Sequence, residues 1–480
     1  MKKYLKISLI LVIILISYLI YAIANRKNDT SLAYYIGPLL PKKVKIYLKN
    51  NFLLFEKIDD QKIEINKQKQ IINKFSLSTE GKFRNNNLKI LFNKIGEDEI
   101  FEINKNKYIF SKFSTTSIIT GKWEPTGGSF YLENFKNNII VVSATGIIAY
   151  NNINFFKNNF FNFTSIKSNI VDLIKDPKFF THSPFGIKDI LIKDNYLYVS
   201  YTYQAEENCY NTSILRSKIN FKKLIFEDFF KPSDCVKIDN TYGNFSAHQS
   251  GGRMKSYDDH SIIFTVGDYG FRDHSQNLDQ TTFGKTILIS SKGFVQEVLS
   301  IGHRNHQGLY HDKESNKIYM TEHGPKGGDE ININDLNQKK IKNYGWPISS
   351  YGEHYGFKTR DEKHPYYVQA PLYKSHLEHG FIEPHKYFTP SIGISEIVKI
   401  NPNFFDRNYY LVFGALGNNI EEGDMSIHFL KVDEADKILD HEIFKVNERV
   451  RDILKFKEKN MLFLALESTS SIGIIKEFKD

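Results

Sequence analysis

The chain has 480 residues, of which 41% are hydrophobic and 25% charged, so its composition is that of a globular protein with enough length to bury a sizeable core. An aromatic content of 14% excludes a disordered chain, and two cysteines can form neither a disulfide framework nor a four-thiolate zinc site. The formal net charge of +9 comes from scattered lysines without a basic arm, which gives no indication of nucleic-acid binding.

The amino terminus carries a targeting pattern. Lys2, Lys3 and Lys6 precede a charge-free, mostly apolar run over residues 7–24. This run is long for a signal peptide and, at about 1.5 Å per residue, just long enough to cross a hydrocarbon core about 30 Å thick. Residues 1–24 therefore predict either a cleaved signal peptide or a retained anchor. Both place the rest of the chain outside the cytoplasm, secreted into the periplasm or tethered to the inner membrane.

In an oxidising compartment, Cys209 and Cys235 are expected to pair. Residues 25–85 are rich in Lys, Asn and Ile and look helical between residues 55 and 75, which predicts a spacer or small helical segment. From residue 86 to residue 480, short β-branched and aromatic runs alternate with Gly, Asn and Asp, the pattern of strands and turns.

Six of these runs resemble one another, because in each a polar turn leads into four or five apolar residues. They are Asn138–Ser143, Asn195–Ser200, Ser261–Thr265, Lys317–Thr321, Asn408–Phe413 and Asn460–Ala465. Their spacing is mostly roughly 50 to 65 residues, with one gap of about 90 that must hold an insertion. The period predicts an all-β fold, a six-bladed β-propeller of four-stranded blades, and unrelated strands of a β-sandwich are the alternative.

Polar and glycine-rich loops lie between these strands. His248, beside Asp268 at the end of the next strand, is a candidate general base with an orienting carboxylate. Arg304 and Asn305 offer donors to a ligand bearing carboxylates and carbonyls. The glycine-rich segment 321–332 exposes backbone carbonyls, which suit a hard cation such as Ca²⁺.

Four segments make the sequence recognisable. They read His-Gln-Ser-Gly-Gly-Arg at 248–253, Gly-His-Arg-Asn-His-Gln-Gly-Leu at 302–309, Glu-His-Gly-Pro-Lys-Gly-Gly-Asp-Glu-Ile-Asn at 322–332 and Asn-Tyr-Gly-Trp-Pro at 343–347. They closely resemble the glucose/sorbosone dehydrogenase family, which contains the soluble PQQ-dependent aldose sugar dehydrogenases. The resemblance covers roughly residues 183–480 and implies a six-bladed propeller with PQQ over its axis.

The resemblance also implies roles for single residues. His248 matches the catalytic base and Asp268 the acid that supports it. The implied reaction is removal of the C1 hydroxyl proton of a sugar by His248, with hydride transfer from C1 to PQQ. The substrate is then an aldose or a related alcohol, with an electron acceptor that the motifs do not identify.

Further residues match the cofactor and metal sites of the family. Arg304 and Asn305 match the pair that contacts PQQ. Gly324 and Pro325 match the residues whose carbonyls hold Ca²⁺, and Asp329 matches a nearby acid of the substrate pocket.

The chain also departs from the family. Segment 183–189 lacks the usual Gln, His306 replaces a Pro, and segment 390–396 is altered. Most importantly, residues 412–430 contain neither Lys nor Arg, where the family places cations for the PQQ carboxylates, and Lys399 is a possible substitute. Burying three carboxylates with fewer cations is costly.

Two alternative functions therefore stay open. One is a propeller that has lost PQQ and serves as an extracytoplasmic binding module. The other is a propeller hydrolase such as a lactonase, for which the sequence shows no set of axial acidic ligands. The segment 351–355 and the insertion between the fourth and fifth repeats are expected to determine substrate choice.

Overall fold

A computed structural model of the protein describes residues 79–115, 128–155, 159–182, 184–240, 244–278, 281–355, 363–401, 408–456 and 460–478. The chain divides into two units, residues 1–74 and 75–480. The predicted targeting segment and the helical look between residues 55 and 75 lie outside the described residues. Within the described ranges, no helix is both long enough and apolar enough to span a membrane.

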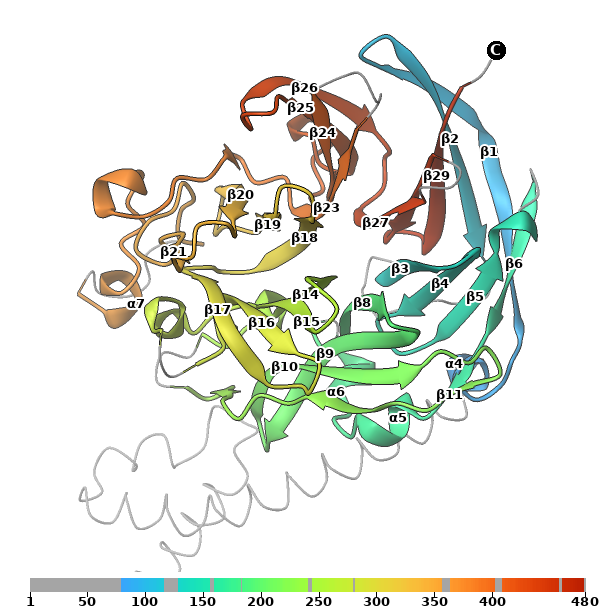
Figure 1. Ribbon diagram of the computed structural model, residues 1–480, viewed down its shortest axis with the longest axis horizontal. Helices are drawn as coiled ribbons and strands as arrows, with labels where there is room; N and C mark the ends of the chain where they lie inside the picture. Colours follow the sequence, from blue (N-terminus) through green and yellow to red (C-terminus); the bar gives the residue numbers. More distant parts are fainter. Residues whose placement is uncertain are drawn as a thin grey trace, which may run out of the picture. The chain divides into compact units, whose positions relative to one another are not determined.

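The described residues between 79 and 478 form successive antiparallel sheets built on four strands each, and further strands pair with some of them (Figure 1). The first sheet consists of β3 (Phe130–Phe135), β4 (Asn138–Ser143), β5 (Ile148–Asn152) and β6 (Phe160–Ser165). The second consists of β8 (Ile187–Lys193), β9 (Tyr196–Glu206), β10 (Cys209–Lys218) and β12 (Glu227–Phe230). The third consists of β14 (Gly251–Ser256), β15 (Ser261–Val266), β16 (Lys285–Ser290) and β17 (Val295–Ile301).

The remaining sheets repeat this plan. The fourth consists of β18 (His306–Asp312), β19 (Lys317–Glu322), β20 (Asp329–Asp335) and β22 (Lys386–Phe388). The fifth consists of β23 (Ile394–Ile400), β24 (Tyr409–Ala415), β25 (Ser426–Val432) and β26 (Ile438–Lys445). The sixth consists of β27 (Val450–Phe456), β28 (Met461–Leu466), β29 (Ser471–Glu477) and β2 (Asn106–Thr115).

Short elements lie before, between and within these sheets. They are α4 (Thr79–Asn85), η2 (Ile153–Phe155), β7 (Lys167–Ser168), α5 (Ile170–Leu173), α6 (Lys178–Thr181), β11 (Lys223–Leu224), β13 (Val236–Lys237), η3 (Ala247–Gln249), η4 (Arg272–Gln276), β21 (Lys342–Asn343), α7 (Pro365–Val368), η5 (Leu377–His379) and η6 (Ile420–Glu422). The predicted insertion is confirmed, since β21, α7 and η5 lie between β20 and β22.

The sheets are the blades of a six-bladed β-propeller, as predicted. The innermost strands β3, β8, β14, β18, β23 and β27 contact one another in turn around the ring, and β27 contacts β3 (Figure 1). All six predicted repeats coincide with the second strand of a blade: β4, β9, β15, β19, β24 and β28.

The ring is closed by strands from both ends of this unit. The amino-terminal strand β2 pairs with β29 and completes the sixth blade, with Phe113 opposite Ile472. Strand β1 (Lys89–Ile103) pairs with β2 on one side and with β6 of the first blade on the other. The first and sixth blades are thereby joined into one continuous sheet.

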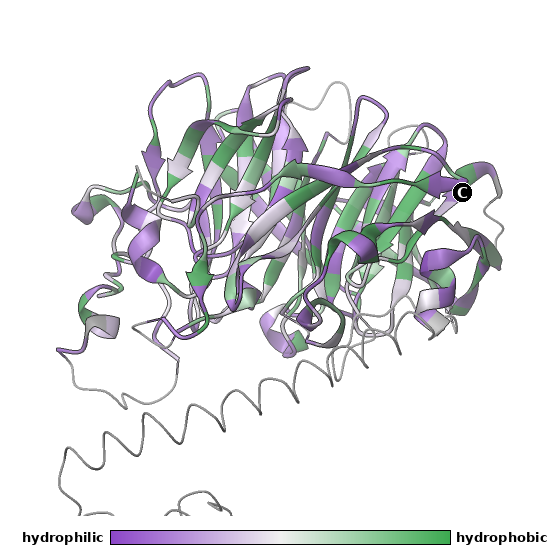
Figure 2. Cartoon of the chain, turned by 90° about the horizontal axis from the view of Figure 1, so that it is seen from below, coloured by the Kyte–Doolittle hydropathy of each residue, from purple (hydrophilic) through white to green (hydrophobic). Residues whose placement is uncertain are grey.

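Each blade buries both of its faces against its neighbours, which explains the unbroken apolar runs in the sequence. In β4, Ile139 and Val141 pack in the cluster shared with the sixth blade, whereas Ile140 and Val142 pack in the cluster shared with the second. Successive side chains of a strand point to opposite faces, so one run serves two cores. Figure 2 shows hydrophobic residues concentrated along the strands of the blades.

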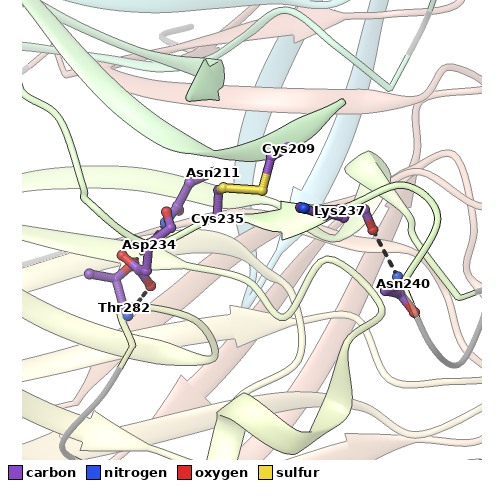
Figure 3. Close-up of a disulfide and its surroundings, with 7 residues drawn as sticks. All are labelled: Cys209, Asn211, Asp234, Cys235, Lys237, Asn240 and Thr282. Carbon is purple, nitrogen blue, oxygen red and sulfur yellow. Dashed lines mark hydrogen bonds between the residues drawn. A yellow bond between two sulfur atoms is a disulfide. The ribbon is translucent and has the colours of Figure 1, made fainter. Parts of the chain in front are cut away.

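The predicted disulfide is confirmed. Cys209 opens β10, Cys235 lies just before β13, and their Cα atoms are 5.4 Å apart in the bonded pair (Figure 3). Beside the disulfide, Asp234 accepts a hydrogen bond from the Thr282 amide at 2.7 Å. The bond therefore fastens the loop after β12 to the second blade.

Candidate active site

A cavity of about 360 Å³ lies where the loops that lead into the innermost strands converge. Five of the seven predicted site residues line it: His248, Arg304, Asn305, Gly324 and Asp329. They come from η3 before β14, from the loop before β18 and from the β19–β20 connection. The propeller thus brings together residues from separate segments, and the volume lies within the usual range of small-molecule sites.

His248 is exposed to this cavity at the turn that leads into β14. Partial removal from water, followed by the positive charges of Lys188 and Arg451, lowers the pKa of His248 to about 4. The imidazole is therefore neutral near pH 7 and can accept a proton.

Asp268 is fully buried and does not line the cavity. Its carboxylate accepts hydrogen bonds from the Gly270 amide at 2.8 Å and from the Trp346 indole at 2.7 Å. With its nitrogen facing Asp268, the Gln249 side chain donates to Oδ1 at 2.7 Å and its oxygen accepts from Arg304 Nη2 at 3.1 Å. Asp268 therefore acts on Gln249 and Arg304, and the direct His248–Asp268 pair that the sequence predicts does not form among the described residues.

Hydrogen bonds to neighbouring residues hold Arg304 and Asn305 in place beside the cavity. The Arg304 amide donates to Glu322 Oε2 at 3.0 Å, and its Nη1 donates to the carbonyl of His323 at 2.9 Å. Asn305 Oδ1 accepts from the Gly251 amide at 3.2 Å. These bonds hold both side chains at the cavity wall.

The predicted metal-binding loop is held by Asp329. Its carboxylate accepts from the Gly324 amide at 3.2 Å and from the Ile394 amide at 3.0 Å. A Cβ at Gly324 would lie 2.1 Å from the Gly328 carbonyl oxygen, so the close turn requires glycine there. Pro325 does not line the cavity, and its carbonyl accepts from Ser391 Oγ at 3.4 Å.

Sequence reasoning missed three cationic residues of the cavity wall. Arg449 directly precedes β27, Arg451 is the second residue of β27, and Lys188 lies in β8. The alternation Arg-Val-Arg before the sixth repeat was the available signal, since residues two apart share one side of a strand. Cations of the second and sixth blades therefore line the cavity, whereas residues 412–430 contain neither Lys nor Arg.

Lys399 does not compensate for that absence, contrary to the suggested substitution. Its ammonium pairs with Asp312 at 2.6 Å and lies over the Tyr409 ring, and Lys399 is not among the residues that line the cavity. The carboxylate of Asp312 therefore already neutralises its charge.

Three axial carboxylates do converge, which the sequence did not indicate. Asp189, Glu396 and Asp452 lie on the innermost strands of three blades with their oxygens within 4.8 Å of one another. Arg253 Nη1 lies 3.2, 2.7 and 3.0 Å from them, respectively. A guanidinium therefore occupies the position that a metal ion would need, and the cluster is an ionic core beneath the cavity.

The cavity suits an anionic, polar ligand. Within the described residues, Arg451 Nε and His323 Nε2 are buried without a hydrogen-bond partner, and both side chains line the cavity. Among the described residues that line the cavity, Asp329 is the one acid. The lining holds five Lys and Arg side chains: Lys188, Arg253, Arg304, Arg449 and Arg451. These donors match a ligand that carries several carboxylates.

Comparison with known proteins agrees with this geometry. The family model described as Glucose / Sorbosone dehydrogenase matches residues 164–473. Aldose sugar dehydrogenase YliI of Escherichia coli (strain K12) is 26% identical over 317 residues, which cover 62% of this chain and 78% of that protein. Quinoprotein glucose dehydrogenase B of Acinetobacter calcoaceticus is 26% identical over 196 residues, covering 34% of this chain and 39% of that protein.

A protein of Synechocystis sp. described as uncharacterized, slr1608, is 29% identical over 226 residues, which cover 42% of this chain and half of that protein. Among solved structures, the soluble aldose sugar dehydrogenase from Escherichia coli in its apo-form is similar in fold. Its TM-score is 0.55 at 20% identity, covering 73% of this chain and 96% of that chain.

Proposed function

Because the chain belongs to the glucose/sorbosone dehydrogenase family, we propose that it is a PQQ- and Ca²⁺-dependent dehydrogenase that oxidises an aldose or a related alcohol at C1. The observation that carries the proposal is that Arg304, Arg449 and Arg451 lie around the neutral imidazole of His248 in one cavity. The names of two relatives, an aldose sugar dehydrogenase and a quinoprotein glucose dehydrogenase, support the same chemistry.

Residues of this chain would hold the cofactor and the metal as follows. Arg304, Arg449 and Arg451 would neutralise carboxylates of PQQ by charge-assisted hydrogen bonds. The carbonyls of Gly324 and Pro325 are oxygen ligands of the kind that Ca²⁺ takes. When bound, PQQ supplies the quinone that accepts the hydride from the sugar, and Ca²⁺ polarises that quinone.

The chain's own part in the reaction is to hold the sugar and to move a proton. An aldose in the cavity presents its C1 hydroxyl to His248, and a neutral imidazole nitrogen accepts the hydroxyl proton. Burial of Asp268 against Gln249 and Trp346 fixes the turn that carries His248. General-base catalysis of this kind contributes typically about 10² to 10⁴-fold.

The binding-module alternative rested on missing cations, and the cationic wall of Lys188, Arg449 and Arg451 removes that reason. The hydrolase alternative needs a metal on the axial carboxylates, a position that Arg253 occupies. Neither alternative is favoured by an observation at this site.

The compartment is part of the proposal. A targeting segment in residues 1–24 and a disulfide between Cys209 and Cys235 both support a protein that works outside the cytoplasm. Residues 7–24 would tether it to the inner membrane if they are retained, and its electrons would pass to an acceptor in that compartment.

The test is a titration of the purified protein with PQQ in the presence of Ca²⁺, followed by absorbance. We expect saturable binding, and then dye reduction that depends on an added aldose. Absence of saturable PQQ binding would overturn the proposal before any sugar is chosen.

A further inference from the structure

Lys188 stands at the same position in the second blade as Arg451 in the sixth. In β8 the pairing with β9 passes from Ile187 directly to Asp189, so Lys188 is the extra residue of a bulge. In β27 the pairing with β28 passes from Val450 directly to Asp452, so Arg451 is the extra residue there. Bulges next to active sites change the direction of a side chain, and both of these side chains line the cavity.

The residue directly after each bulge is an aspartate that contacts the same arginine. Asp189 and Asp452 lie 3.2 and 3.0 Å from Nη1 of the same Arg253. The two innermost strands are therefore anchored to one guanidinium, each with a basic residue directly before its anchoring Asp. Lys188 is therefore the counterpart of Arg451, and both contribute a positive charge to the cavity lining.

The surroundings of Lys188 leave its charge uncompensated. Its ammonium donates to the Pro184 carbonyl at 2.6 Å and forms no ion pair with a carboxylate of the described chain. Its stem lies against Gly252, where a Cβ would come within 2.5 Å of the Lys188 Cβ. Gly252 has a φ of +107°, so the glycine in this motif makes the room that Lys188 occupies.

The other cations that line the cavity differ from Lys188 in this respect. Arg253 faces three carboxylates, Arg304 is linked to Asp268 through Gln249, and Arg449 and Arg451 share Glu467. Lys188 has a backbone carbonyl in place of an acid, so its positive charge is available to a ligand.

We propose that Lys188 binds a carboxylate of the ligand in the central cavity and supplies from the second blade the cation that residues 412–430 lack. This inference rests on the proposed function, because it takes the ligand to be a carboxylate-bearing cofactor or an acidic sugar.

The electrostatics of the site support this assignment. Burial, and then the positive charge of Arg451, lowers the pKa of Lys188 to about 7. The charged and titratable groups that face it are Arg451, Glu467 and His248. A bound carboxylate would restore the ammonium form, so ligand binding and the protonation of Lys188 favour each other.

The experiment compares Lys188→Gln and Lys188→Arg with wild-type protein by absorbance titration of PQQ with Ca²⁺ at pH 6.5. We expect K188Q to weaken PQQ binding about 10- to 100-fold, the cost of one charge-assisted hydrogen bond, and K188R to restore most of the affinity. Lys193→Gln is the matched control, since Lys193 lies on the same strand, pairs with Asp194 at 3.0 Å and is not among the lining residues.

A second arm distinguishes a carboxylate of the cofactor from one of the sugar. It measures kcat/KM for glucose and for glucuronate with PQQ-saturated wild-type and K188Q protein. Loss of PQQ affinity assigns Lys188 to the cofactor, and selective loss of glucuronate turnover assigns it to the sugar. If neither changes while wild-type protein binds PQQ, the role of Lys188 is refuted and the proposed function stands, whereas wild-type protein that binds no PQQ overturns both.

Discussion

Arg451 and Glu467 form a buried ion pair in which Nη2 of the arginine lies 3.1 and 3.0 Å from the two carboxylate oxygens. The same carboxylate accepts from Arg449 Nε at 3.2 Å and from the hydroxyl of Ser129. Burial alone would raise the pKa of Glu467, but Arg451 and Arg449 hold it below its ordinary value. One acid thus positions two guanidinium groups and leaves one positive charge for the cavity.

Replacing Arg451 should therefore reduce affinity for the cofactor. We expect Arg451→Met to weaken PQQ binding about 10- to 100-fold in an absorbance titration, because a charge-assisted contact is lost and Glu467 loses a partner. Arg216→Met is the control, since Arg216 pairs with Glu227 at the surface. Unchanged PQQ affinity in R451M would show that this wall does not bind the cofactor.

His248→Ala should affect turnover and spare cofactor binding. We expect turnover to fall about 10² to 10⁴-fold, with PQQ affinity close to that of wild type. His260→Ala, a histidine outside the cavity lining, should leave both unchanged. A turnover that survives H248A would assign the base to another group.

The pH dependence of wild-type turnover tests the same residue. The base must be neutral, and the pKa of His248 is lowered to about 4 by desolvation and then by Lys188 and Arg451. Turnover limited by this group should therefore stay level from pH 7 to about 5 and fall as the ring protonates near pH 4. Loss of turnover already centred near pH 6.5 would show an unperturbed histidine instead.

The blades could be predicted because their signal is local. Both faces of a strand such as β4 are buried, so Ile139–Val142 reads as one apolar run, and the run recurs once per blade. Ring closure could not be predicted in this way. The pairing of β2 with β29 joins residues more than 350 positions apart, and nothing in either strand indicates its partner.

The cavity was predictable where its residues form dense motifs, as around His248 and Asp329. Lys188 escaped prediction because it is a single basic residue in a strand, and the bulge at its position turns it toward the cavity. Arg451 is also a bulge residue, and the Arg-Val-Arg alternation alone did not show which residues it would face. The partner of Asp268 was mispredicted for a similar reason. The position of Asp268 at the end of the strand that follows the His248 loop, and the family resemblance, suggested His248, but the turn of η3 presents the next residue, Gln249.

The disulfide should contribute measurably to stability. In a chain-entropy estimate, closing a loop of 26 residues stabilises the folded state by roughly 3 to 4 kcal/mol. Replacing both Cys209 and Cys235 by Ser should lower the free energy of unfolding by that order in a urea titration. Thiol titration of denatured, unreduced wild-type protein should find no free thiol, and two free thiols would contradict the pairing.

The ionic core beneath the cavity predicts a stability that rises as the pH falls toward 6. Burial raises the pKa of Asp189 to about 6 and that of Glu396 to about 7, despite the attraction of Arg253. An unfolded carboxyl titrates near pH 4, so between pH 4 and 7 the folded state holds protons that the unfolded state has released. The free energy of unfolding then decreases as the pH rises through this window, by at most about 1.4 kcal/mol per pH unit for each such proton.

Glu396→Gln removes one of these groups and mimics its protonated form. We expect its urea midpoint to exceed that of wild type at pH 8 and the difference between pH 6 and pH 8 to shrink. Glu297→Gln on the exposed edge of β17 should leave both midpoints unchanged. An E396Q protein less stable than wild type at pH 8 would mean that the attraction of Arg253 outweighs the cost of burying the charge.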